Sequence, residues 1–180
     1  MNASTAIWMF TSLFTCAAAA WDWKSRKIPN WLTVPGLVAG VTLHAALNGW
    51  AGASFALKGA GLALVLLLPL VLLRAFGAGD WKLMGAVGAF LGWRLFLFVL
   101  AGSIFASGFM AIIQMYRVGR VMETLRNMWI LLRGFFAFGL KKNPNISLDN
   151  PRLLKLPFGV AVAAATIACF CAARWLYHQA

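Results

Sequence analysis

Leu62-Ala-Leu-Val-Leu-Leu-Leu-Pro-Leu-Val-Leu-Leu73 is the most hydrophobic stretch of the chain, and Phe76-Gly-Ala-Gly-Asp-Trp-Lys-Leu83 follows it after two residues. The chain has 180 residues, of which 62% are hydrophobic and 11% are charged, and its mean hydropathy is +0.81. A soluble domain of this length cannot bury so many apolar side chains, so the composition indicates an integral membrane protein. The predicted fold class is all-α, a polytopic bundle of about six transmembrane helices in a single domain over residues 1–180.

Apolar runs separated by charges or turn residues predict the positions of these helices. The expected helices are Thr5–Trp21, Trp31–Leu47, Gly59–Phe76, Leu83–Gly92, Phe96–Tyr116 and Pro157–Tyr177. Asn48–Lys58 is interpreted as a short connection. Leu83–Gly92 is too short for an ordinary span, because ten helical residues cover about 15 Å against roughly 30 Å of hydrocarbon. Either this helix starts inside the membrane or the bilayer is thin around it.

The basic residues favour contact with lipid. The formal charge of +12 would indicate nucleic acid in a soluble protein, but here the basic residues separate apolar runs. Cytoplasmic anchoring and contact with anionic lipid are therefore expected, and nucleic acid is not. Residues 116–156 form a basic loop, in which apolar positions at helical spacing between Val118 and Leu140 predict an amphipathic helix in the membrane interface.

The distribution of positive charge also predicts the topology. Thirteen of the 16 Lys and Arg residues fall in the loops after the first, third and fifth predicted helices: Lys24, Arg26, Lys27, Arg74, Lys82, Arg117, Arg120, Arg126, Arg133, Lys141, Lys142, Arg152 and Lys155. Loops rich in Lys and Arg stay in the cytoplasm, so both termini are expected outside. This orientation places Asp22 and Asp80 at the cytoplasmic ends of their helices, at matching depth.

Asp22 and Asp80 are candidate catalytic residues because they are two of only four acidic residues and both adjoin membrane segments. The structural alternative for Asp22 is an interfacial acid balanced by nearby basic residues, and for Asp80 it is a helix N-cap. Two carboxylates held a few ångströms apart share a proton. One can then accept a proton from water while the other donates to a scissile carbonyl, which predicts amide hydrolysis by general acid–base catalysis.

No metal site and no cofactor are expected. The sequence lacks a His-Glu-x-x-His motif and a Walker A loop. Its cysteines, Cys16, Cys169 and Cys171, lie in apolar runs and do not form a Cys-x-x-Cys pair, so they are interpreted as small core residues. His44 is interpreted as a packed or interfacial residue.

The residues around both acids resemble those of the prepilin peptidases, which are bacterial membrane aspartic proteases of the GxGD type. Gly77-Ala-Gly-Asp80, extended by Lys82-Leu83, resembles the GxGD motif of that family. Asp22 with Ile28-Pro-Asn-Trp-Leu-Thr33 resembles its first-aspartate motif, and Leu156-Pro-Phe-Gly-Val160 is similar to the start of its final helix. The resemblance extends from about Trp21 to Ala165.

The resemblance implies a peptidase of the bacterial inner membrane that removes the short basic leader from prepilin-like precursors at the cytoplasmic face. Asp22 and Asp80 would be its catalytic pair, and Gly77 and Gly79 would shape the loop that brings the pair together. The supporting positions are Lys82, Pro29 and Asn30. Larger members carry a cysteine-rich zinc region and also methylate the new terminus. The sequence has no such region, so it is similar to the short peptidases of Flp-type (tight-adherence) pilus systems, without methyltransferase activity.

Two other classes of function remain open from the sequence. A small proton-coupled transporter or channel would use the same two acids as a relay. A non-catalytic factor for assembling a membrane complex would need neither acid. The transporter is disfavoured because both acids are expected near one membrane face.

Overall fold

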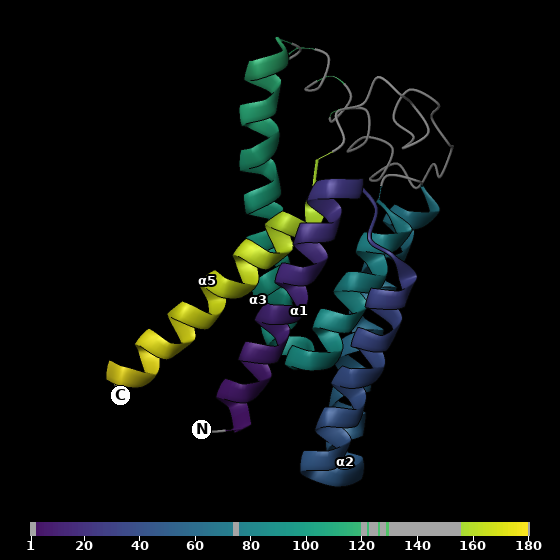
Figure 1. Ribbon diagram of the computed structural model, residues 1–180, viewed down its shortest axis with the longest axis vertical. Coiled ribbons are helices and arrows are strands. Elements are labelled where there is room, and N and C mark those ends of the chain that lie inside the picture. Colours follow the sequence, from purple (N-terminus) through teal and green to yellow (C-terminus); the bar gives the residue numbers. More distant parts are fainter. Residues whose placement is uncertain are drawn as a thin grey trace.

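The computed structural model describes residues 3–73, 76–119, 122, 126, 129 and 156–179. These residues form the helices α1 (Ala3–Ser25), α2 (Asn30–Leu72), α3 (Ala78–Val118) and α5 (Phe158–Gln179), which Figure 1 shows as one bundle. All four are long and apolar enough to cross a membrane. The predicted all-α membrane bundle is therefore confirmed, and the chain is a multi-pass membrane protein. The amphipathic helix expected within the basic loop lies largely outside the described residues.

The number of helices differs from the predicted six because two of the four assigned helices reverse direction internally. α2 leaves helical geometry at Asn48 (φ −133, ψ 18) and Gly49 (φ 58, ψ −142), and α3 does so at Gly92 (φ 71, ψ 174). Glycine adopts a positive φ without a steric penalty, so each reversal needs only one or two residues. The expected connection Asn48–Lys58 is wrong for this reason, since the alanine- and leucine-containing residues after the turn continue the helix.

The first half of α3 forms the centre of the bundle. Every residue from Leu83 to Gly92 is buried. Gly40, in the first half of α2, packs so closely that a Cβ there would lie 2.9 Å from the Cβ of Ala89. In the second half of α2, the backbone of Gly59 contacts that of Gly88. Glycines let helices approach this closely, and the two halves of α2 therefore enclose the first half of α3.

This central segment is shorter than a full membrane span. The helical run Ala78–Leu91 has 14 residues (91 − 78 + 1) and extends about 21 Å, compared with roughly 30 Å of hydrocarbon. In Figure 1 the reversal of α3 accordingly lies above the reversal of α2. His44 is buried beside this reversal, and its Nε2–H donates a hydrogen bond to the carbonyl of Phe90 at 2.8 Å.

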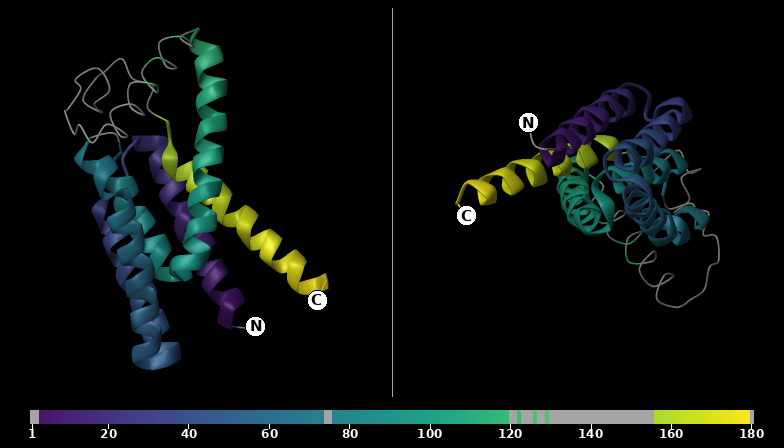
Figure 2. Two further views of the ribbon diagram at one scale, coloured as in Figure 1. Left: turned by 180° about the vertical axis from the view of Figure 1, so that it is seen from behind. Right: turned by 90° about the horizontal axis from the view of Figure 1, so that it is seen from below.

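α1 and α5 pack on each other and on α3. The rings of Trp8 and Phe170 stack with their centroids 5.9 Å apart, whereas the C-terminal part of α5 leads away from the α2–α3 pair (Figure 2). Large apolar side chains point outward, including Leu13, Val65 and Phe98, which are about 70% exposed. Such a surface suits contact with lipid. Two cysteines, Cys16 and Cys171, are also exposed, so the interpretation of all three as core residues is wrong.

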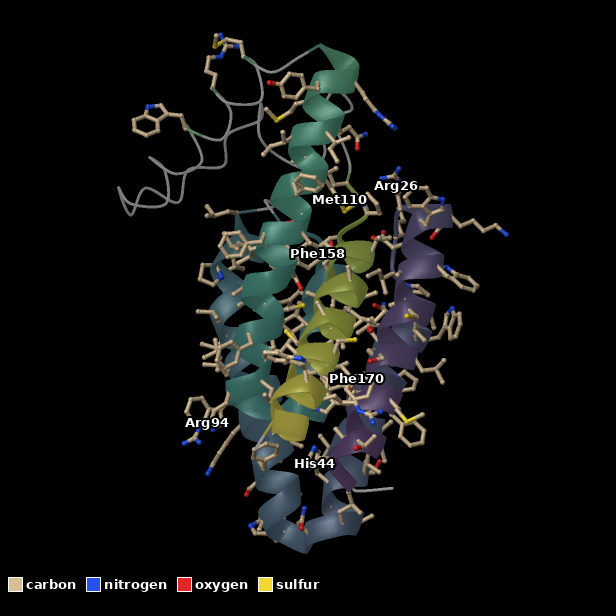
Figure 3. The ribbon with its side chains drawn as sticks, turned by 90° about the vertical axis from the view of Figure 1, so that its left-hand side faces the viewer. Arg26, His44, Arg94, Met110, Phe158 and Phe170 are labelled. Carbon is tan, nitrogen blue, oxygen red and sulfur yellow. The ribbon has the colours of Figure 1, made fainter. Side chains whose placement is uncertain are left out.

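The links between helices gather at one end of the bundle. The α1–α2 link, the α2–α3 link and the start of α5 lie together, opposite the two chain termini (Figure 1). In Figure 3, Arg26 and Phe158 mark this end, and His44 and Arg94 lie toward the other. We call the first the motif end, defined by residues 26–29, 76–80 and 156–159.

Candidate active site

Asp22 lies in the last turn of α1, and its side chain is 4% exposed. Arg26 ends the helix with a left-handed backbone (φ 54), and its N–H donates to the carbonyl of Asp22 at 2.8 Å. The carboxyl Oδ2 accepts a hydrogen bond from the backbone N–H of Gly159, also at 2.8 Å. The charge of Arg26 acts on this carboxyl too, but the direct partner comes from another helix rather than from the neighbouring basic side chains.

The start of α5 is suited to this contact. Gly159 is the second residue of α5, and the first N–H groups of a helix have no partner within the helix. They also form the positive end of the helix dipole, which favours a carboxylate. A Cβ on Gly159 would lie 3.1 Å from the Cβ of Asp22 and 3.2 Å from its Oδ2, so glycine gives Asp22 the space it occupies.

Asp80 lies in the first turn of α3, three residues after the N-cap Gly77. It is therefore not the N-cap, and that structural alternative is wrong. Its carboxyl group folds back over Gly77, where an added Cβ would lie 2.6 Å from Oδ2. The side chain is partly buried, and none of the described residues donates a hydrogen bond to its carboxyl group.

The segments that follow Asp22 and surround Asp80 contact each other directly. A Cβ on Gly79 would lie 2.9 Å from the carbonyl oxygen of Ile28. Lys82 Nζ donates a hydrogen bond to Asn30 Oδ1 at 3.0 Å. Pro29 stands between these contacts as the N-cap of α2. The structure thus brings together the three predicted supporting positions and the second glycine of the loop.

The contacts between these segments bring both carboxyl groups to the motif end, where the charge of Asp22 acts on Asp80. Among the described residues these are the only acidic side chains. In this part of the chain, no three His, Cys, Asp or Glu residues gather as metal ligands would. The arrangement places two carboxyl groups at the motif end, with the charge of one acting on the other.

Phe158 and Gly159 join this site, although the sequence did not single them out as site residues. The ring of Phe158 packs edge-on against Phe76 with their centroids 5.0 Å apart. Gly159 binds Asp22, so the start of α5 touches both acid-bearing segments. The sequence did contain a signal, because Leu156-Pro-Phe-Gly-Val160 stands out as a helix start. The donor, however, is a backbone N–H group, and the type of residue at position 159 does not reveal which backbone groups bind a distant carboxyl group.

The sequence profile of the type IV leader peptidase family matches residues 9–112, which is more than half of the chain and includes both Asp22 and Asp80. The chain belongs to the type IV leader peptidase family. The family predicted from the two aspartate motifs is confirmed, and the chain is a peptidase of the leader-peptidase kind. The start of α5 lies beyond the residues that this family match covers. Neither a curated protein nor a solved structure matches the sequence.

Proposed function

We propose that this chain is a membrane-embedded aspartic endopeptidase of the GxGD type, a single domain that cleaves the leader from prepilin-like precursors. The observation that carries the proposal is the direct contact between the segments that bear Asp22 and Asp80, in a chain of the leader peptidase family. Both acids belong to membrane helices, where an ionisable group is expensive to retain unless it has a function. They are also the only two acids among the described residues.

The chemistry follows from two carboxyl groups that hold one proton between them. The ionised group accepts a proton from water as the water oxygen bonds to the scissile carbonyl carbon, and the protonated group donates to the carbonyl oxygen. The tetrahedral intermediate collapses when the first carboxyl group returns its proton to the amide nitrogen and the second takes a proton from a hydroxyl group. The C–N bond breaks, and both carboxyl groups return to their starting states.

Other features around the two acids also support this assignment of the site. Gly77 and Gly79 leave space for the carboxyl group of Asp80 and the carbonyl of Ile28. The hydrogen bond from Lys82 to Asn30 ties the start of α2 to the start of α3, and Pro29 is the N-cap with which α2 begins. In the proposed enzyme these residues hold the two acid-bearing segments together without taking part in proton transfer.

The proposed orientation places the motif end in the cytoplasm and the termini outside, in a bacterial inner membrane. Lys24, Arg26 and Lys27 lie at the motif end, and Lys82 bonds to Asn30 there. Arg94 lies toward the opposite end (Figure 3), and so does Lys58, because its neighbour Gly59 packs on Gly92. A majority of positive charge on one side favours the cytoplasm for that side. The substrate is then a precursor with a short basic leader, as in Flp-type pilus systems, and the basic loop binds anionic lipid.

Co-expression with pilin-like precursors tests the proposal. Wild-type protein should convert a leader-bearing precursor to the shorter form on a gel, and Asp22→Asn and Asp80→Asn should each abolish conversion while the protein still inserts. Asp149→Asn is the matched control, since it makes the same chemical change outside the described residues. Retained cleavage by either site variant would remove that residue from the catalytic pair.

The same variants separate the proposal from the two other classes. A transporter would carry protons into liposomes in a way that Asp22→Asn abolishes, without cleaving any precursor. An assembly factor would keep its function in both Asn variants. Loss of cleavage together with unchanged proton flux supports the peptidase.

A further inference from the structure

A single buried hydrogen bond joins Asp22 to a residue 137 positions later in the chain. Its donor is the backbone N–H of Gly159, which cannot rotate away as a side chain could and can only donate. Its acceptor is Oδ2 of Asp22, a residue that is 4% exposed. Because Oδ2 already accepts this hydrogen bond, Oδ1 is the oxygen that keeps all of its acceptor capacity for a proton from water.

The neighbouring residue ties the start of α5 to the second acid-bearing segment. Phe158 packs edge-on against Phe76, and Phe76 lies four residues before Asp80. The side chain of Phe158 and the backbone of Gly159 therefore contact the two acid-bearing segments from consecutive positions. This makes the start of α5 a common support for the two acid-bearing segments.

We propose that Gly159 is the positioning residue for Asp22, holding Oδ2 so that Oδ1 accepts the proton from water while Asp80 donates its proton to the carbonyl oxygen. The inference rests on the proposed function and assigns the two acids their separate roles. A hydrogen bond from a backbone N–H to an ionised carboxylate is stronger than one between neutral groups, so the held carboxyl group is suited to start the reaction ionised. Asp80 lies at the positive end of the α3 dipole, but it lacks such a donor among the described residues, and the nearby charge of Asp22 disfavours a second negative charge on it. It is therefore suited to start protonated.

Gly159→Ala is the first test because the added methyl group would press on Asp22. Its Cβ would lie 3.1 Å from Asp22 Cβ, so the carboxyl group must shift by a few tenths of an ångström. Misplacing a catalytic group reduces turnover, and we expect kcat to fall about tenfold while KM stays within about twofold. Gly102→Ala is the matched control. Its Cβ would also meet a neighbour at 3.1 Å, but this neighbour is Ala165, further along α5. This control should keep kcat within about twofold of wild type.

Nuclear magnetic resonance of protein labelled with ¹⁵N-glycine provides the second test, which does not depend on activity. The chain has 17 glycines, and the Gly159 resonance is assigned in wild-type protein from sequential connectivities to Phe158 and Val160. An amide that donates to a carboxylate resonates at low field. We expect Asp22→Asn to move this resonance strongly to high field and Asp80→Asn to move it much less.

These outcomes separate the inference from the proposed function. If Asp22→Asn and Asp80→Asn abolish cleavage but Gly159→Ala keeps wild-type kcat, the positioning role is wrong and the peptidase stands. If either Asn variant still cleaves, the proposed function itself fails. If Gly159→Ala does not fold, the resonance decides, and equal shifts in the two Asn variants would overturn the inference.

Discussion

Asp22 and Asp80 are the same residue type at the same end of the bundle, but they occupy opposite ends of their own helices. Asp22 lies in the last turn of α1, where the helix dipole disfavours negative charge. Asp80 lies in the first turn of α3, where the dipole favours it. The carboxyl group of Asp22 is compensated by the first turn of another helix, through Gly159. Asp80 is therefore placed by its local sequence, whereas Asp22 depends on a distant part of the chain.

The segments around Asp22 and Asp80 are therefore not equivalent halves of a site. The Gly77–Asp80 segment carries its own turn, its own helix start and its own favourable dipole. Asp22 needs the hydrogen bond that α5 provides. Substitutions at each segment should therefore differ in their effects on cleavage and stability.

Gly79→Ala should have the largest effect, because it separates the two acid-bearing segments. The added Cβ would lie 2.9 Å from the carbonyl oxygen of Ile28, and backbone atoms on both sides would have to move. A displacement near 1 Å can cost about 100-fold in turnover, so we expect cleavage of the precursor to fall by about that factor. Gly61→Ala is the control, since nothing lies within 4 Å of the added methyl group. Cleavage near the wild-type rate in Gly79→Ala would show that this contact does not set the distance between the acids.

The second prediction concerns stability and measures the asymmetry directly. Asp22→Ala leaves the buried N–H of Gly159 without its acceptor, which should reduce the free energy of unfolding by about 1–3 kcal/mol. Asp80→Ala removes no hydrogen bond to a described residue, so its effect should stay within about 0.5 kcal/mol. Thermal unfolding of both variants in the same detergent measures the difference. Equal losses of stability in the two variants would contradict the stronger dependence of Asp22 on its hydrogen bond to Gly159.

The smallest effect is expected at the exposed contact between Lys82 and Asn30. A hydrogen bond from a charged donor at an exposed position contributes about 0.2–1 kcal/mol. A double-mutant cycle with Lys82→Met and Asn30→Ala should give a coupling energy in that range, measured by thermal unfolding. Cleavage should fall less than about fivefold in each single variant, which follows from the same energy. A larger loss of cleavage with little loss of stability would place Lys82 or Asn30 in the chemistry instead.

Much of the fold follows from hydropathy, which fails where a helix reverses direction. The apolar runs locate all four described helices, and the shortness of Leu83–Gly92 anticipates the central segment. The connection expected at Asn48–Lys58 is wrong because a reversal needs only Asn48 and Gly49, and the residues after them are good helix formers. Hydropathy measures how apolar a segment is and does not reveal where a helix turns back.

The candidate site shows a similar division between what is local and what is distant. Asp22 and Asp80 stand out in the sequence because acids are rare in it and costly beside a membrane segment. The contacts of Gly77 and Gly79 agree with the turn expected there. The role of Gly159 could not be predicted, because its donor is a backbone group and its acceptor is 137 residues away. Only the packing of α5 against α1 brings the two together.

The hydrogen bond between Asp22 and Gly159 has a consequence for how the protein matures. Ribosomes make the chain from its N-terminus, so both aspartates enter the membrane before α5 has been synthesised. Until that helix inserts, the carboxyl group of Asp22 faces the unfavourable end of its own helix and lacks its donor. Under the proposed role of Gly159, a half-made chain holds both acids but cannot cut. Proteolytic competence then arises only once α5 is in place.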